Sequence, residues 1–130
     1  VKSTGDLGDH IRSPEGAEAW ASVDEYGVEV RVRSGEVLDH TVLRSYCIGA
    51  AHMALGWVRR EALSVSEEGV PLDLTIRSFG VLRATETPKV VVSIVTDGRS
   101  VNGSDAVFAA VTLAAWRATG FAPRWPTMRT

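Results

Sequence analysis

Two segments with the periodicity of a helix are separated by shorter segments with the periodicity of a strand. Apolar residues recur at helical spacing over residues 41–63 and 104–119. Residues 28–32 and 72–76 alternate apolar and polar side chains, which predicts half-buried strands, and the β-branched residues 89–95 predict a central strand. This order of elements favours an α+β fold, in which a mixed or antiparallel sheet carries the two main helices on one face.

The 130 residues of the chain are about the length of one ordinary domain. Residues 1–12 are rich in Gly, Asp and Ser and have little to bury, so we expect a flexible N-terminal arm there. A single α+β domain is then expected over residues 13–130. The Ser-Pro-Glu sequence at residues 13–15 is typical of a helix start and predicts a short helix, which Gly27 ends with a break into a strand.

Charge and cysteine content restrict the classes of partner. The net charge of -2 argues against a nonspecific nucleic-acid binder. Residues 1–70 carry seven basic and twelve acidic side chains, whereas residues 71–130 carry seven and four, a division that suits self-association or docking to a partner. The lone Cys47 is typical of a reducing compartment, and no apolar run approaches the roughly 20 residues of a membrane span. We therefore expect a cytoplasmic protein without a nucleic-acid or membrane partner.

Common catalytic and metal-binding motifs are absent from the sequence, which has no P-loop, no GxSxG, no HExxH and no CxxC. Cys47 and His52 lie five positions apart, so about 500° of helical rotation separates them and their side chains diverge. We therefore predict no metal site. Cys47 is interpreted as a buried helix residue and His40 as a surface residue.

Small residues form a stripe along the first long helix. Ser45, Gly49, His52 and Gly56 follow one another at spacings of four, three and four, which places them on one helix face. Because a glycine inside a helix costs about 1 kcal/mol relative to alanine, two of them suggest close approach by another backbone or by a ligand. Tight packing within the protein is the alternative interpretation.

The turn before the second long helix is the other candidate site. Gly103, Ser104 and Asp105 stand where that helix begins, and the amides of a first helical turn can receive an anion or a developing oxyanion. Ser104 and Asp105 can equally serve as ordinary capping residues for the same amides. The sequence alone leaves both possibilities open.

Three segments of the chain together match the pattern of one family. In "SYCIGAAHMALGWVRREAL", Gly49, Gly56 and Glu61 match a glycine-rich helix that is followed by a glutamate. Residues 74–95 are similar to the stretch after that helix, with Thr87-Pro88 at its Asp-X-Pro-like turn, and residues 101–127 resemble the closing Gly-Val-Gly-Glu turn, its helix and the final tail. In these three segments the chain resembles the molybdopterin-binding large subunits of the xanthine dehydrogenase and carbon monoxide dehydrogenase family.

The resemblance extends over residues 28–127 and implies that the chain matches the last segment of a much longer subunit. In that family the glutamate of the closing turn is the base that activates a molybdenum-bound hydroxyl. Ser104 or Asp105 stands at or beside its position here, and aspartate keeps the carboxylate but is shorter by one methylene. Tyr46 stands where the family has a glutamine.

Three hypotheses follow from these residues. The first is a detached C-terminal portion of a molybdenum hydroxylase large subunit, working with a larger molybdopterin-binding partner. The second is a noncatalytic assembly or binding module, in which the small-residue faces are contacts between subunits, as in a homo-oligomer. The third is a cofactor-independent enzyme with Asp105 as base, His52 as acid and Tyr46 as donor.

Together these hypotheses define the candidate site. Molybdopterin would be bound through the partner chain, or no cofactor would be bound by this chain alone. The candidate catalytic residues are Asp105, Ser104, His52 and Tyr46, and the candidate cofactor-binding residues are Gly49, Gly56 and Gly103.

Overall fold

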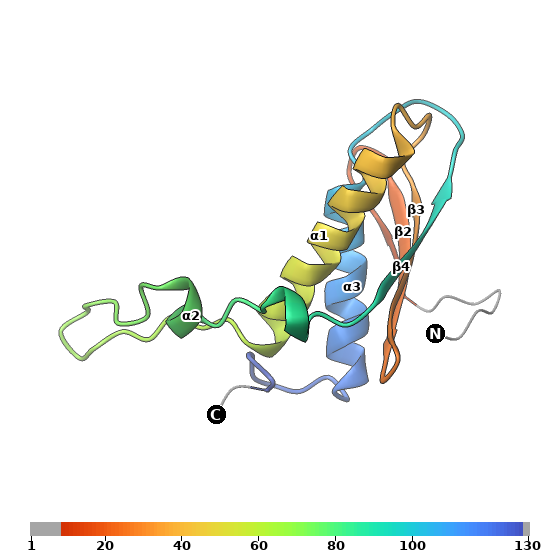
Figure 1. The fold of residues 1–130 in the computed structure, drawn as a ribbon. Helices are drawn as coiled ribbons and strands as arrows, with labels where there is room; N and C mark the ends of the chain where they lie inside the picture. Colours follow the sequence, from red (N-terminus) through yellow and green to blue (C-terminus); the bar gives the residue numbers. More distant parts are fainter. Residues whose placement is uncertain (1–8, 129–130) are drawn as a thin grey trace.

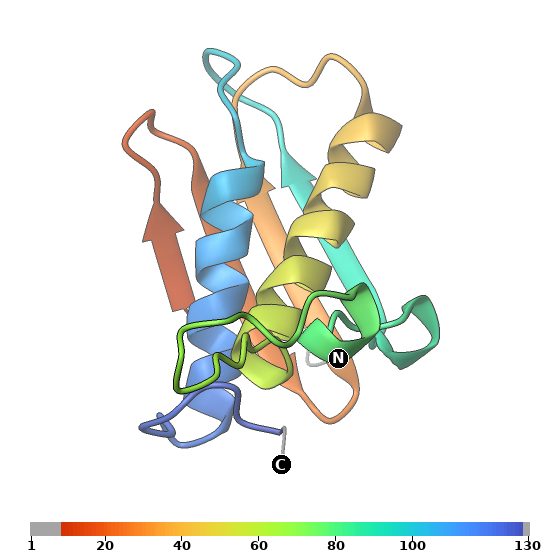
Figure 2. The same ribbon diagram turned by 90° about the vertical axis from the view of Figure 1, so that its left-hand side faces the viewer.

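A four-stranded sheet with two long helices on one face forms the body of the protein (Figure 1). The computed structural model describes residues 9–128. Its elements are β1 (Asp9–Arg12), β2 (Glu18–Asp24), β3 (Gly27–Arg33), α1 (His40–Arg59), α2 (Ile76–Phe79), the 3-10 helix η1 (Ala84–Glu86), β4 (Val90–Val95) and α3 (Ser104–Ala118). The α+β class with both main helices on one face is thereby confirmed, as Figure 2 shows with α1 and α3 in front of the sheet.

The sheet is mixed, with strand order β1-β2-β3-β4. β1, β2 and β3 are antiparallel neighbours, whereas β3 and β4 are parallel. Because parallel neighbours need a crossover, α1 lies between them in the sequence and packs across the sheet. β4 was expected as a central strand, yet in the described part of the chain it pairs with β3 alone and forms an edge. A β-branched run fits any half-buried pleated surface, so its composition does not distinguish an edge strand from a central one.

Small and β-branched side chains fill the space between the sheet and the helices. Ala19 pairs with Val32 and Ala21 pairs with Val30 across the β2–β3 ladder, and all four are fully buried. Since alternate residues of a strand share one face, these side chains point together at the helices. The buried faces of both helices are also rich in small residues, namely Cys47, Ala50, Ala51, Ala54, Ala106, Ala110 and Ala114. The alanine-rich face of α3 is therefore largely used by the domain's own core.

Both long helices were predicted from the sequence. α1 begins one residue before the expected range of 41–63, and the Asp39 side chain accepts a hydrogen bond from the Val42 amide at 3.0 Å. It ends at Arg59, where the Gly56 carbonyl accepts from the Arg60 amide at 2.8 Å.

Within the described residues, no helix combines the length and the apolar character that a membrane span requires.

The short helix expected to begin at Ser13 and end before Gly27 is wrong, because residues 13–17 form the turn of a β-hairpin and β2 follows. The Ser13 amide donates to the Ala17 carbonyl at 2.8 Å, and the Ala17 amide donates to Ser13 Oγ at 3.0 Å. Gly16 has a φ of +98°, which ends any helical path. Residues 9–12, expected as part of a flexible arm, form β1, and the rest of that expected arm lies outside the described residues.

β1 is attached to α3 by a charged pair. Asp9 is 8% exposed, and both of its carboxylate oxygens accept from Arg117 Nε at 2.9 Å. The Asp9 carboxylate raises the pKa of Arg117 through these hydrogen bonds and its charge. The pair therefore holds the outer strand of the sheet against the helix layer.

The strand expected at residues 72–76 is also wrong. Residues 72–74 are loop, and Thr75 caps the short helix α2 by accepting from the Ser78 amide at 3.0 Å. The alternating apolar side chains of this segment are exposed, because no sheet lies beneath them for them to cover. An alternating pattern predicts a strand only where a partner strand is available, and here only one isolated bridge forms, between Val65 and Pro71.

Candidate functional site

A groove between α1 and α3 contains four of the seven residues that the sequence singled out. Its volume is about 410 Å³, and we call it the helix groove. Tyr46 and Gly49 line it from α1, while Ser104 and Asp105 line it from α3. The other lining residues are Ser45, Ala50, Met53 and Phe108. The wall is therefore largely apolar, and Asp105 is its one charged side chain.

A second cavity adjoins the helix groove at the ends of the two helices. It has a volume of about 470 Å³ and shares Tyr46 and Ser104 with the groove. Gly103 lines this cavity, together with apolar residues that include Leu38 and Val42. Five of the seven candidate residues consequently lie around one continuous region, at the start of α3 and on the facing side of α1.

The start of α3 is capped by a residue that sequence reasoning missed. Asn102 Oδ1 accepts from the Ser104 amide at 3.0 Å and from Ser104 Oγ at 2.9 Å. Asp105 Oδ1 accepts from the Ala106 amide at 2.8 Å. Protein oxygens thus already satisfy two amides of the first turn, which reduces the capacity of this helix end for an anion. An Asn two positions before the helix is a recognisable capping signal.

The three candidate glycines have different surroundings. A Cβ at Gly49 would meet no atom within 4 Å, so an outside group can approach the α1 backbone there. A Cβ at Gly103 would lie 2.9 Å from the Cβ of Ser34, and one at Gly56 would lie 2.5 Å from Glu61 Oε1. Gly56 and Gly103 therefore allow close packing within the chain, and Gly49 is the one that leaves open space.

Gly49→Ala is expected to raise the free energy of unfolding by about 0.5–1 kcal/mol, because alanine is the better helix former and its methyl group meets open space. Urea unfolding followed by circular dichroism measures the change. Gly56→Ala is the matched control, since its methyl group must displace the Glu61 carboxylate, and we expect a smaller gain or a loss. Destabilisation by Gly49→Ala would show that the space beside Gly49 is occupied.

His52 lies outside the helix groove. Its Nε2 is 2.8 Å from the carbonyl oxygen of Leu82, which joins α1 to the segment before η1. Burial raises the pKa of the nearby Glu61 carboxyl, and the His52 charge acts in the opposite direction. In the cofactor-independent enzyme hypothesis, the acid His52 therefore does not share the helix groove with the base Asp105 and the donor Tyr46.

The lone cysteine and the histidines do not form a cluster. Cys47 is fully buried, as expected, and burial raises the pKa of its thiol to about 11. His40 is exposed, also as expected. Among residues 9–128, no group of three or more His, Cys, Asp or Glu side chains is placed to hold a metal ion.

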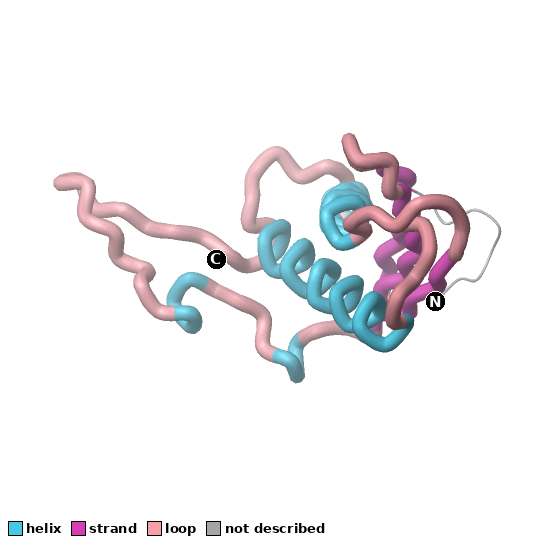
Figure 3. The backbone as a smooth tube through the Cα atoms, turned by 90° about the horizontal axis from the view of Figure 1, so that it is seen from above, coloured by secondary structure: helices cyan, strands magenta, loops and turns pink. Residues whose placement is uncertain are grey.

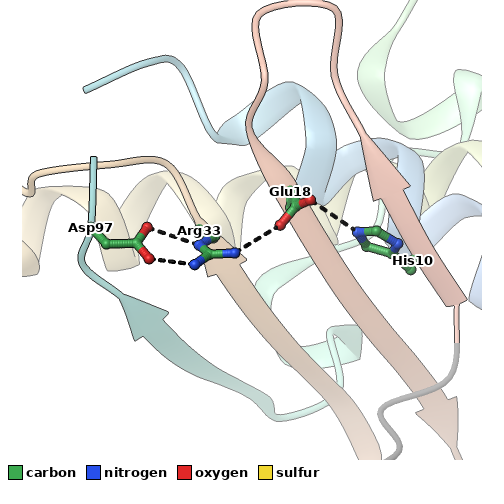
Figure 4. Close-up of polar contacts among 4 residues, drawn as sticks. All are labelled: His10, Glu18, Arg33 and Asp97. Atoms are coloured by element: carbon green, nitrogen blue, oxygen red, sulfur yellow. Dashed lines mark hydrogen bonds and ion pairs between the residues drawn. The ribbon is translucent and has the colours of Figure 1, made fainter. Parts of the chain in front are cut away.

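A charged cavity of about 810 Å³ lies at one end of the sheet, and none of the candidate residues lines it. Figure 4 shows its ion pairs, in which Arg33 lies between Asp97 and Glu18, and Glu18 also faces His10. Hydrogen bonds to Asp97 and Glu18 raise the pKa of Arg33, and the bond from Arg33 lowers that of Asp97. Since the Arg33 guanidinium already has two carboxylate partners, these ion pairs link β3 to β2 and to the segment after β4.

The fold is similar to parts of CO dehydrogenases and of a quinoline oxidoreductase. No protein-family model matches the sequence, and a search of curated proteins found no match. The similar solved structures include a Cu,Mo-CO dehydrogenase in its carbon monoxide reduced state (TM-score 0.56, 15% identity) and a reconstituted CO dehydrogenase from Oligotropha carboxidovorans (TM-score 0.60, 14% identity). Quinoline 2-oxidoreductase from Pseudomonas putida 86 is another (TM-score 0.58, 12% identity).

These likenesses cover 76–78% of this chain but only 14–15% of the chains to which it is similar. At such low identity they show the fold. The resemblance noted in the sequence is thereby confirmed at the level of the fold. The matched part of this chain spans about one seventh of the length of each of those chains.

Proposed function

We propose that this chain is the C-terminal portion of a split oxidoreductase of the molybdenum hydroxylase type, acting in the cytoplasm with a larger molybdopterin-binding partner. One observation carries the proposal. Residues from two segments far apart in the sequence, Tyr46 and Gly49 on α1 and Ser104 and Asp105 on α3, line one groove in a fold that is similar to parts of molybdenum enzymes.

The helix groove does not fit a complete molybdopterin. The pterin carries an anionic phosphate, whereas the groove has one carboxylate, that of Asp105, and no cationic side chain among its lining residues. The Ser104 and Ala106 amides already have acceptors. The partner would therefore hold the cofactor, and this chain would contribute one wall of the site.

Two features of that wall suit such a contribution. The open space at Gly49 allows a flat group to approach the helix backbone. Asp105 is exposed at the groove, and its carboxylate is oriented by the bond from the Ala106 amide. An oriented carboxylate can accept a proton from a group that the partner brings within hydrogen-bond distance.

The noncatalytic assembly module is the second candidate function, and the packing of two glycines favours it. Gly56 and Gly103 are in close contact with the chain's own side chains, so their small size is explained without a cofactor. The apolar wall around Met53 and Phe108 could then be a contact between subunits. The two functions differ in whether a molybdenum-bearing partner copurifies with the chain.

Native mass spectrometry with molybdenum analysis, on the chain purified from its natural host, tests the proposal. We expect a complex with a larger, molybdenum-bearing protein. Gly49→Leu fills the helix groove and should lower the amount of that complex at least tenfold, whereas Gly49→Ala should retain it. A lone monomer would contradict the proposal, and a molybdenum-free assembly of identical copies would favour the assembly module.

A further inference from the structure

Residues 62–79 leave the body of the protein as one loop, which we call the projecting loop. A hydrogen bond from the Ala62 amide to the Phe79 carbonyl, 2.9 Å long, closes its base at the end of α1. Figures 1 and 3 show it extending away from the helix layer, with α2 on its returning side. In Figure 2 it passes in front of the lower ends of α1 and α3, so it stands on the helix side of the molecule, opposite the sheet.

The projecting loop exposes an unusual number of large apolar side chains. Six of them are 53–76% exposed, namely Leu63, Val65, Val70, Leu72, Leu74 and Ile76. Scattered apolar residues are normal on a protein surface, but a concentration of them on one segment marks an interaction site. The most exposed pair is Leu74, in the loop before α2, and Ile76, the first residue of α2.

The backbone of the projecting loop is ordered by its own hydrogen bonds. The Ser66 amide donates to the Val70 carbonyl at 2.9 Å, and the Leu72 amide donates to the Ser64 carbonyl at 2.8 Å. Asp73 Oδ2 accepts from the Ser64 amide at 2.8 Å. These bonds shape a two-stranded ribbon, but an isolated ribbon is only marginally stable in water unless another surface covers it. The projecting loop is thus shaped for contact with another protein, and a partner that covers it would stabilise it.

We propose that the projecting loop is the docking element for the larger partner, which receives it in an apolar groove. This inference rests on the proposed function. The similar structures contain this fold as 14–15% of a much longer chain, so a large protein body is available there to cover such a loop. The loop also lies on the side of the molecule that carries α1 and α3, whose residues line the helix groove, so one partner can contact both.

The charge of the loop tip adds one property of the partner. Glu67 and Glu68 form the exposed turn of the ribbon, between the apolar residues Val65 and Val70. A groove that receives this ribbon should therefore be apolar along its length and basic at its end, because a buried carboxylate needs a cationic partner. A second copy of this chain fits less well, since Asp105 is the one charged residue of its helix groove.

A double variant, Leu74→Asp with Ile76→Asp, tests the inference in the chain purified from its natural host. We expect at least a tenfold loss of the molybdenum-bearing complex in native mass spectrometry, with unchanged helical content by circular dichroism. Tyr26→Asp is the matched control, because Tyr26 is 70% exposed in the β2–β3 turn, and its complex should persist. Reversal of the tip charge, with Glu67→Lys and Glu68→Lys, should also weaken the complex.

The outcomes separate this inference from the proposed function. A molybdenum-bearing complex that survives the double variant overturns the inference and leaves the proposed function intact. A wild-type homodimer that the double variant converts to monomers overturns both, because the loop would then bind a second copy. Loss of the complex in the loop variant but not in Tyr26→Asp supports the inference.

Discussion

Gly35→Ala is expected to lower the free energy of unfolding by about 2–5 kcal/mol. Gly35 has a φ of +81°, and a left-handed conformation costs an L-residue about 1–2 kcal/mol. A Cβ at this position would lie 1.9 Å from the carbonyl oxygen of Arg99 and 2.7 Å from the Ser100 nitrogen. Both are backbone atoms, so the connection itself must move, and overpacking of this kind typically costs a further 1–3 kcal/mol.

The close approach at Gly35 matters because it joins two connections that border the site. The Val101 amide donates to the Ser34 carbonyl at 2.9 Å, and the Glu36 amide donates to the Gly98 carbonyl at 3.1 Å. These bonds fix the segment after β3 against the segment after β4, and hence the start of α3 against α1. Movement there should also disturb the cavity beside Gly103, which both segments line.

Gly98→Ala is the matched control for Gly35→Ala. Gly98 has a φ of +76°, close to that of Gly35, but a Cβ there would meet nothing within 4 Å. We therefore expect it to cost only the backbone strain, about 1–2 kcal/mol. Urea unfolding of both variants measures the difference. Equal losses would show that strain alone explains the glycine and that the packing against Arg99 contributes nothing.

The helices and the fold class could be predicted because their signals are local and long. Residues 41–63 and 104–119 each contain several turns of one apolar period, which few other structures produce. The pairing of Tyr46 and Gly49 with Ser104 and Asp105 also follows once both helices lie on one face of the sheet, although the resemblance first singled out these segments. Antiparallel or mixed pairing remained open, since strand order depends on contacts far apart in the sequence.

The errors fall where a short local pattern had two readings. The Ser-Pro-Glu sequence at 13–15 can start a helix or form a hairpin turn. The antiparallel pairing of β1 with β2 requires the turn. Residues 72–76 alternate as a strand does, but no neighbouring strand is present, and the segment became part of the projecting loop. Tertiary contacts determine which secondary structure such a segment adopts, and local composition does not reveal those contacts.

The individual site residues were the least predictable. The small size of Gly103 is explained by its contact with Ser34, more than 60 positions away in the sequence. Likewise His52 shares a helix stripe with Gly49, yet it bonds to Leu82 while Gly49 opens on the helix groove. A stripe on a helix is broad enough for its members to face different neighbours.

Cys47 should make the protein less stable at alkaline pH. The thiol is fully buried, and burial raises its pKa to about 11, against an ordinary value near 9.0. Below about pH 8 the thiol is neutral in the folded and unfolded chains, so its contribution to stability is fully present. As pH rises through 9 the unfolded chain releases the proton first, and stability falls until the folded thiol also ionises near pH 11.

The size of this effect follows from the separation of the two pKa values. At pH 10.5 we expect a loss of about 2 kcal/mol relative to pH 8, measured by urea unfolding at both values. Cys47→Ala is the matched variant, because every other side chain is unchanged and only the thiol is removed. The variant should begin less stable at pH 8, through the packing lost with the sulfur, and should decline less as pH rises. Parallel declines would mean that the thiol is not kept neutral by the fold, and that α1 opens to solvent on the side that packs against the sheet.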